Sequence, residues 1–392
     1  MAMQLSARVQ RIKPSPTLAV TARAAELKAQ GKDIIGLGAG EPDFDTPEHI
    51  KEAAHKAIRD GFTKYTPVGG TPGLKKAIIA KLERDNGLKY GPKQILVSCG
   101  GKQSCYNLCQ ALLNSGDEVV IPAPYWVSYP DMVLLSDGKP VFIETTPEAR
   151  YKITAEQLAA AITPRTRLIF LNSPSNPSGI AYSKAELTKL GEVLRKHPQV
   201  VIATDDMYEK IMWTAEPFAN ILNAGPDLYE RTVVIHAVSK TYSMTGWRIG
   251  FAAGPEPLIK AMENVQSQST SNPTSISQVA AEAALNGDQT CVTRMVEAFK
   301  QRHDYVYAQL AKMPGVKVLP SDGTFYSFPD FLGAIKHLGL KSDLEFGDYL
   351  IEKGVAMVPG SAFGTPGAMR ISFATSQANL EKALARTAEA IK

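Results

Sequence analysis

The sequence predicts an α/β fold in which a mainly parallel central sheet is sandwiched by helices, followed by a smaller α+β domain. Between residues 94 and 253, short β-rich apolar runs alternate with segments of helical periodicity, the order expected of a parallel sheet layered by helices. Beyond about residue 255, helical segments are followed by short strand candidates, which predicts a second domain. The 392 residues are enough for two or three domains.

The strand candidates of the central sheet are apolar on both faces, as strands buried between two helix layers are. They lie at residues 94–98, 118–121, 140–143, 167–171, 200–204, 232–236 and 249–253. The helices between them carry start and stop signals, such as Thr71-Pro72 at the start of a helix that Gly87 ends. Further signals are Thr46-Pro47 with Gly61, the capping boxes Thr154/Gln157 and Ser183/Glu186, and a long helical segment at about 288–312. The strand candidates of the tail are 316–319, 325–328, 355–358 and 369–373.

The composition argues against several classes of protein. The net charge is only +4, from 43 basic and 39 acidic residues without a basic block, which argues against a protein that binds nucleic acid or a membrane surface. No apolar stretch approaches the roughly 18 residues that cross a bilayer, and residues 1–16 lack a hydrophobic signal core. We therefore expect a cytoplasmic protein whose partners are small molecules. The four cysteines form no Cys-x-x-Cys pair and the six histidines show no ligand spacing, so we predict reduced thiols and no metal.

Two glycine-rich segments resemble nucleotide-binding loops without matching them. The run at 36–40 follows an apolar segment, but Glu41-Pro42 comes next instead of a helix, so a tight turn is the better interpretation. Gly100-Gly101-Lys102 follows a strand, yet the residues required of a nucleotide P-loop are missing at both of its ends. A glycine turn that opens a helix can still present backbone N–H groups to a phosphate.

Polar residues collect where the predicted strands end. Asp205 ends one apolar strand, Asn176 follows another, and Ser239-Lys240 follows a third, with Arg248 eight residues further on. A single lysine is most often a solvated surface residue. Ligands of α/β sheets bind at the carboxyl ends of the strands, and this set of residues therefore predicts a site at one edge of the sheet.

Taken in order, the motifs of the chain resemble those of the fold-type I pyridoxal-phosphate (PLP) aminotransferases, class I branch, in the bacterial aspartate and aspartate/prephenate form. They are Gly-Glu-Pro-Asp-Phe at 40–44, Lys-Tyr at 64–65, Gly-Gly-Lys-Gln at 100–103, Pro-Tyr-Trp at 124–126, Asn-Pro-Ser-Gly at 176–179, Asp205 with Tyr208, Ser-Lys at 239–240, Gly-Trp-Arg at 246–248 and Arg370. The resemblance implies a large PLP-binding domain at 48–285 and a small discontinuous domain made of 1–47 and 286–392. It also implies a homodimer with active sites at the interface.

The resemblance implies a role for each residue around the cofactor ring. Lys240 would bind the cofactor aldehyde and then carry a proton to and from the substrate Cα. Asp205 would keep the ring nitrogen protonated, and Asn176 and Tyr208 would donate to the ring oxygen. Trp126 would stack on the ring face. Of these, the expected catalytic residues are Lys240, Asp205 and Tyr208.

The same resemblance assigns residues to the cofactor phosphate and to the substrate. The expected phosphate contacts are Ser239, Arg248, the amides near Gly101 and Lys102, and Tyr65 from the other subunit. Arg370 would hold the substrate α-carboxylate as a bidentate fork, with a backbone group of Gly40 beside it. Lys102 would contact the distal carboxylate, and Lys13 is the position linked with prephenate. The expected substrate-contacting set is Gly40, Trp126, Asn176, Arg370, Lys102 and Lys13.

The function expected from this resemblance is transfer of the amino group of aspartate or glutamate to a 2-oxo acid through PLP, with prephenate as a further substrate of some relatives. A PLP-dependent β-lyase and an aminotransferase for aromatic or neutral amino acids stay open as alternatives. A non-catalytic effector-binding module on the same fold is disfavoured, because no helix-turn-helix extension or basic patch is present.

Overall fold

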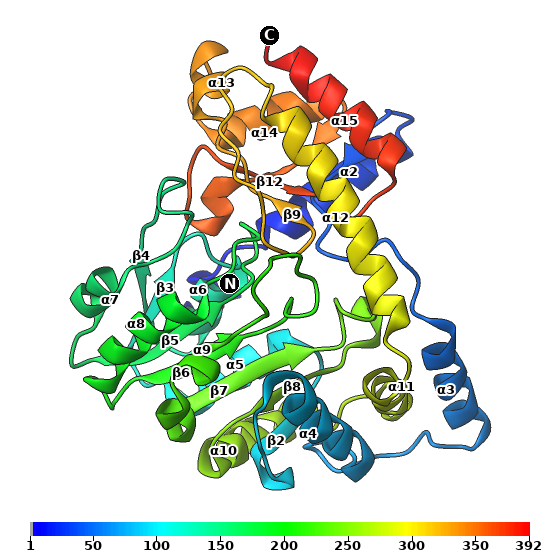
Figure 1. The fold of residues 1–392 in the computed structure, drawn as a ribbon, viewed down its shortest axis with the longest axis vertical. Coiled ribbons are helices and arrows are strands. Elements are labelled where there is room, and N and C mark those ends of the chain that lie inside the picture. Colours follow the sequence, from blue (N-terminus) through cyan, green and yellow to red (C-terminus); the bar gives the residue numbers. More distant parts are fainter. Residues whose placement is uncertain (1–2) are drawn as a thin grey trace.

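A central sheet of seven strands forms the base of the molecule (Figure 1). The computed structural model describes residues 3–392, so the first two residues of the expected small-domain segment lie outside it. The strand order is β2-β8-β7-β6-β5-β3-β4, with parallel pairing from β7 to β4 and antiparallel pairing of β8 with both β7 and β2. The strands are β2 (Ile95–Ser98), β3 (Glu118–Pro122), β4 (Lys139–Ile143), β5 (Thr166–Asn172), β6 (Val201–Asp205), β7 (Thr232–Ala237) and β8 (Gly250–Ala253). All seven strands expected for the sheet are present, and the α/β class is confirmed.

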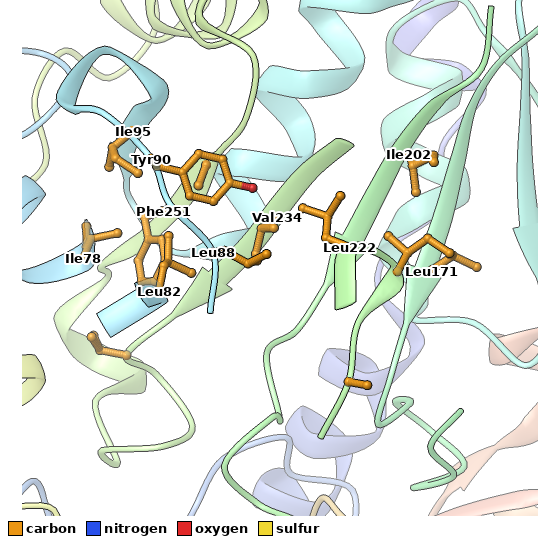
Figure 2. Packing of buried hydrophobic residues seen from close by; sticks show 14 of the residues in the cluster. Ile78, Leu82, Leu88, Tyr90, Ile95, Leu171, Ile202, Leu222, Val234 and Phe251 are labelled. Atoms are coloured by element: carbon orange, nitrogen blue, oxygen red, sulfur yellow. The ribbon is translucent and has the colours of Figure 1, made fainter. Parts of the chain in front are cut away.

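Helices cover both faces of this sheet because its strands are apolar on both sides. On β5, Ile169 and Leu171 belong to one buried cluster, and the alternate residues Leu168 and Phe170 belong to another. The first cluster packs under α3 (Glu48–Arg59), α4 (Pro72–Asn86), α7 (Ala155–Ala161), α8 (Lys184–Arg195), α9 (Ile221–Ala224) and α11 (Ser275–Asn286). Figure 2 shows this packing from α4 across the strands to Leu222 of α9. The second cluster packs under α5 (Gly101–Leu112), α6 (Ser128–Leu135) and α10 (Glu256–Ser267).

Three helix signals of the sequence correspond to observed caps, whereas Thr46-Pro47 does not, because α3 begins after Pro47 without a side-chain cap. The Thr71 hydroxyl accepts a hydrogen bond from the backbone N–H of Leu74, and Gly87 ends the helix with φ of 67°. Both expected capping boxes, Thr154/Gln157 and Ser183/Glu186, are formed.

A second assembly of elements lies beyond one edge of the sheet. It contains the long helix α12 (Thr290–Leu310), which runs from beside α11 up to α15 (Figure 1). Its other elements are α2 (Pro16–Ala29), β1 (Ile35–Gly36), β9 (Tyr326–Ser327), α13 (Leu332–His337), α14 (Asp343–Glu352), β10 (Val355–Ala356), β11 (Val358–Pro359), β12 (Met369–Ser372) and α15 (Gln377–Ala390). The short helix α1 (Ala7–Gln10) instead contacts α6, on the face of the central sheet. β1 pairs in parallel with β10, so the N-terminal segment and the tail share a small sheet. Their buried side chains form a separate core around Phe299, Phe325 and Phe346.

One strand expected in the tail is absent. Residues 316–319 form no strand, because only Lys317 pairs, as an isolated bridge with Asp330. Pro320, which has no backbone N–H to donate, follows directly. No helix within residues 3–392 is long and apolar enough to span a bilayer, and the same residues hold no cluster of three His, Cys, Asp or Glu side chains suited to a metal ion.

Candidate active site

A cavity of about 410 Å³ lies at the carboxyl ends of the central strands. Asn172 ends β5 and pairs with Asp205, which ends β6, while Lys240 follows β7. The cavity also reaches the second assembly, through α2 and the strands β9 and β12. It brings together eleven residues singled out in the sequence: Gly40, Gly101, Lys102, Trp126, Asn176, Asp205, Tyr208, Ser239, Lys240, Arg248 and Arg370.

Asp205 is a buried carboxylate held in one orientation. The Tyr129 hydroxyl donates to its Oδ2 at 2.5 Å, and the Met207 backbone N–H donates to its Oδ1 at 3.3 Å. Burial raises the pKa of Asp205, and these two donors oppose that shift. A cation placed beside Asp205 would stabilise the charged form further. The carboxylate is therefore arranged to accept a protonated group from the cavity.

The Lys240 amine faces the same cavity. Its Nζ donates to the backbone carbonyl of Gly40 at 2.5 Å. Burial, together with the guanidinium groups of Arg370 and Arg248, lowers the pKa of Lys240 to about 8, against the opposing charge of Glu41. A lysine with this pKa has a far larger neutral fraction near physiological pH than an ordinary lysine, and the neutral amine can act as a nucleophile or a base.

An anion-binding cradle lies at the start of α5. Gly100 precedes the helix with φ of 86°, and a Cβ atom there would lie 2.4 Å from Arg248 Nη2. Within residues 3–392, no side chain caps this helix end, so its first backbone N–H groups face the cavity beside Arg248 and Ser239. The Arg248 guanidinium is fixed by the carbonyls of Thr245 and Cys99, at 2.7 and 3.2 Å. Together these donors suit a phosphate group.

Arg370 also lines the cavity and is only 2% exposed. Its Nη1 donates to Asn176 Oδ1 at 2.9 Å and its Nη2 donates to the Gly38 carbonyl at 2.7 Å. Its buried Nε has no hydrogen-bond partner among residues 3–392. A buried guanidinium without a carboxylate among these partners is suited to bind an anionic ligand.

Two aromatic contacts complete the cavity. The Lys102 amine lies 5.1 Å from the centroid of the Trp126 ring, and burial together with Arg248 lowers its pKa. The hydroxyl of Tyr208 lies 3.1 Å from that of Tyr326, and burial raises the pKa of Tyr208. Lys102 thus places a second amine in the cavity, beside Trp126.

Two of the expected residues are not brought to this cavity within one chain. Tyr65 is 93% exposed and lies outside the cavity lining. The Lys13 side chain is also exposed, and its backbone contacts the Asp131 carboxylate on α6. The segment after Lys13 does reach the cavity, because Ser15 and residues of the first turns of α2 line it.

Tyr129, Tyr326 and Gly38 take part in the site although the sequence did not indicate them. A signal existed for Tyr129, because it follows Trp126 by only three residues, and the two rings meet edge to face with their centroids 5.3 Å apart. Tyr326 lies in an apolar strand candidate and is indistinguishable there from a core aromatic residue. Gly38 contributes a backbone carbonyl, which carries no side-chain signal.

The chain matches known aminotransferases along nearly its whole length. Residues 32–386 match the family model described as aminotransferase class I and II. An aspartate/prephenate aminotransferase of Nitrosomonas europaea is 61% identical over 393 residues, which cover 98% of this chain and 99% of that protein. The crystal structure of an aspartate aminotransferase from Rhizobium meliloti superposes with a TM-score of 0.96 at 49% identity, covering 100% of this chain and 99% of that one. An aspartate aminotransferase of Thermus thermophilus with maleate gives a TM-score of 0.94 at 42% identity, covering 99% and 100% of the two chains. The protein therefore belongs to the class I and II aminotransferase family.

Proposed function

We propose that this aminotransferase uses PLP to move the amino group of aspartate or glutamate to a 2-oxo acid, and that prephenate is a further substrate. The observation that carries the proposal is the single cavity in which the Lys240 amine, the Asp205 carboxylate, the Arg248 cradle and the Arg370 guanidinium all meet. Relatives named aspartate and aspartate/prephenate aminotransferase support the choice of substrates.

The residues present fit the three reactive parts of PLP. The buried carboxylate of Asp205, with its raised pKa, suits a protonated ring nitrogen. The amine of Lys240 suits an aldehyde, and the cradle of Arg248 and the α5 N–H groups suits a phosphate. Bound there, the cofactor would supply an electron sink for the substrate Cα.

The chain's own residues would then control the transfer of the proton from the substrate Cα. Because a pKa of about 8 leaves the Lys240 amine about half neutral at pH 8, it would be able to take the proton from the substrate Cα and later return a proton. Asp205 would keep the ring nitrogen charged, and its own charge is maintained by the donors Tyr129 and Met207. Asn176 and Tyr208 would orient the ring through its oxygen.

Arg370 would fix the substrate in the orientation that exposes its Cα–H bond to Lys240. A guanidinium fork held at Nη1 and Nη2 by Asn176 and Gly38 has little freedom to move, so a carboxylate bound to it is oriented as well as attracted. Gly40 would contribute a backbone group beside the bound carboxylate, because Gly40 and Arg370 line the same cavity.

Lys102 would recognise the second carboxylate of a dicarboxylic substrate. Its amine lies in the cavity over Trp126, where a compact positive charge can pair with a distal carboxylate. Lys102→Met should therefore reduce kcat/KM for aspartate more than for alanine. Equal reductions for both substrates would contradict this role, and Lys89→Met at an exposed lysine is the matched control. For Lys13 we propose a part in prephenate use, tested by the ratio of prephenate to 2-oxoglutarate activity in Lys13→Met.

The division into domains and the oligomeric state belong to the same proposal. We propose a large domain at 48–285 and a small domain of 1–47 plus 286–392; the pairing of β1 with β10 supports the joining of the two ends. We also propose a homodimer in which Tyr65 reaches the phosphate of the other subunit, because its side chain is 93% exposed and lies outside its own cavity. Sedimentation would give the mass of a dimer, and a monomer that retains full activity would contradict the shared site.

The binding of PLP to Lys240 and the transfer of the amino group can be tested chemically. After reconstitution with PLP, the protein should show a visible absorbance band, and borohydride should fix the cofactor on Lys240 alone, as located by peptide mapping. In a separate sample that has not been reduced, aspartate should convert the band to that of the cofactor amine and release a 2-oxo acid. Labelling elsewhere, or none, would overturn the assignment of Lys240. Ammonia and pyruvate from a substrate with a β-leaving group would indicate the lyase instead.

A further inference from the structure

We propose that Tyr326 is a positioning residue that couples the two halves of the site: its hydroxyl supports Tyr208 at the cofactor ring, and its ring supports Arg370 at the substrate carboxylate. The inference rests on the proposed function, because it assigns Tyr208 and Arg370 to those ligands. Tyr326 lies on β9 and is only 1% exposed. It lines the cavity together with both of these residues.

The contacts of Tyr326 join three separate chain segments. Its Oη lies 3.1 Å from Tyr208 Oη, and the Cζ atom of Arg370 lies 4.4 Å from the centroid of its ring. A Cβ atom at Gly40 would lie 3.2 Å from the same Oη, so only a glycine fits there without displacement. The hydroxyl of Tyr326 therefore lies against Tyr208 and against Gly40, whose carbonyl holds Lys240, while its ring lies against the Arg370 guanidinium.

The backbone of Tyr326 is fixed independently of these contacts. β9 pairs with β12, the strand of Arg370, with Tyr326 opposite Ser372. The Ser321 hydroxyl donates to the Tyr326 carbonyl at 2.8 Å, and the Tyr326 backbone N–H donates to Thr324 Oγ1 at 3.1 Å. A side chain on so constrained a backbone can hold its neighbours in place.

The hydrogen bond between the Tyr208 and Tyr326 hydroxyls has a defined direction once the Tyr208 hydroxyl donates to the cofactor. A phenol has one O–H donor and can still accept. When the Tyr208 hydroxyl donates to the ring oxygen, the hydrogen bond between the two phenols must run from Tyr326 to Tyr208. Hydrogen bonds in series polarise one another, so Tyr208 becomes the stronger donor. Stronger donation to the ring oxygen stabilises its negative charge and lowers the affinity of the neighbouring Lys240 nitrogen for its proton.

The aromatic ring acts separately from the hydroxyl. A guanidinium over an aromatic face in a desolvated site is stabilised by the ring quadrupole, and the Phe363 ring, 5.1 Å from the same Cζ atom, adds a second such contact. The two rings restrict the guanidinium position, while Asn176 and Gly38 fix its in-plane hydrogen bonds. Loss of the Tyr326 ring should therefore weaken substrate binding.

Two substitutions separate these effects. Tyr326→Phe keeps the ring and removes the hydroxyl; it should raise the midpoint of the pH titration of the holoenzyme's visible absorbance by about 0.5 to 1 pH unit and leave KM for aspartate unchanged. Tyr326→Leu removes both groups and should in addition raise KM for aspartate by roughly 10- to 30-fold. In a Tyr208→Phe background, Tyr326→Phe should give no further shift, because the acceptor is gone.

A matched control is Tyr182→Phe, in which a phenol that accepts from the Ile153 N–H at 2.9 Å loses its hydroxyl away from Tyr208 and Arg370. It should leave the titration midpoint unchanged. If Tyr326→Phe binds PLP on Lys240 with the wild-type midpoint, or if the shift persists in the Tyr208→Phe background, the coupling through the hydroxyl is refuted. If Tyr326→Leu does not fold, Tyr326→Phe and the double variant still test the coupling through the hydroxyl. Absence of the band and of Lys240 labelling in the wild type would instead refute the proposed function, which is a different result.

Discussion

Lys240 in the protein without cofactor should react as a neutral amine at pH values where other lysines are protonated. Burial first, and then the charges of Arg370 and Arg248, lower the pKa of its ammonium group to about 8. The sign follows from the lowered pKa: the amine is charged below about pH 8 and neutral above it. The charged form therefore destabilises the folded state below that pH, and this cost is relieved as the pH rises toward the pKa of the unfolded chain.

The size of the effect follows from the two pKa values. With a pKa of about 8, roughly a tenth of Lys240 is neutral at pH 7. An ordinary lysine with a pKa of about 10.4 is neutral to roughly 0.04% at the same pH, so the difference is about 250-fold. Replacing Arg370 by Met removes the second largest cause of the shift and should move the midpoint upward.

The assay is trace acetylation of the protein without cofactor across a pH series, with modification at each lysine measured by mass spectrometry. Acetylation of Lys240 should rise up to about pH 8 and then level off, whereas that of ordinary exposed lysines should keep rising toward their pKa of about 10.4. A midpoint for Lys240 near 10 would refute the reasoning, and so would an unchanged midpoint in Arg370→Met. The wild type measured with PLP bound is the control, because the cofactor should protect Lys240 alone.

Three further substitutions test the structure around the site. Tyr129→Phe removes a charge-assisted hydrogen bond to Asp205 worth about 1.5–3 kcal/mol, so PLP should dissociate at least tenfold more readily in equilibrium dialysis; unchanged affinity would contradict the role of this donor. Lys81→Met leaves the buried Glu209 carboxylate without its lysine partner, so the free energy of unfolding measured in urea should fall by about 3–5 kcal/mol. Adding Glu209→Gln should recover part of that loss. Gly250→Ala places a Cβ atom 2.2 Å from a backbone nitrogen at the start of α5, so Tm and PLP retention should both fall, whereas a wild-type Tm would show that the backbone adjusts freely.

The strands were predictable because each is a short apolar run with a clear boundary. The expected strand at 232–236 corresponds to Thr232–Ala237, and that at 118–121 corresponds to Glu118–Pro122. Such runs are apolar on both faces only when helices cover both faces, so the layer arrangement followed from the same signal. Local hydrogen-bonding chemistry explains the helix ends in the same way, as in the formed capping box of Ser183 and Glu186.

The tail was harder to predict from the sequence. The segments 316–319 and 325–328 are both short and apolar, yet only the second contains a strand, at Tyr326–Ser327. Pairing partners far along the chain decide such cases, since Tyr326 pairs with Ser372 and Lys317 finds only a single bridge. A window of a few residues holds no information about those partners.

The sequence by itself determined the chemistry available to this protein: a lysine, a carboxylate and a phosphate-binding turn at the ends of successive strands, and an arginine in the tail. Only the tertiary structure decided what each group does, because burial and distant neighbours set its properties. The lowered pKa of Lys240 depends on Arg370, which lies 130 positions further along the chain. The orientation of Asp205 depends on Tyr129, and that of Arg370 on Asn176, Gly38 and Tyr326. These contacts join residues that are remote in sequence, and electrostatic and hydrogen-bond energies depend on distance and solvent exposure, which only the fold establishes.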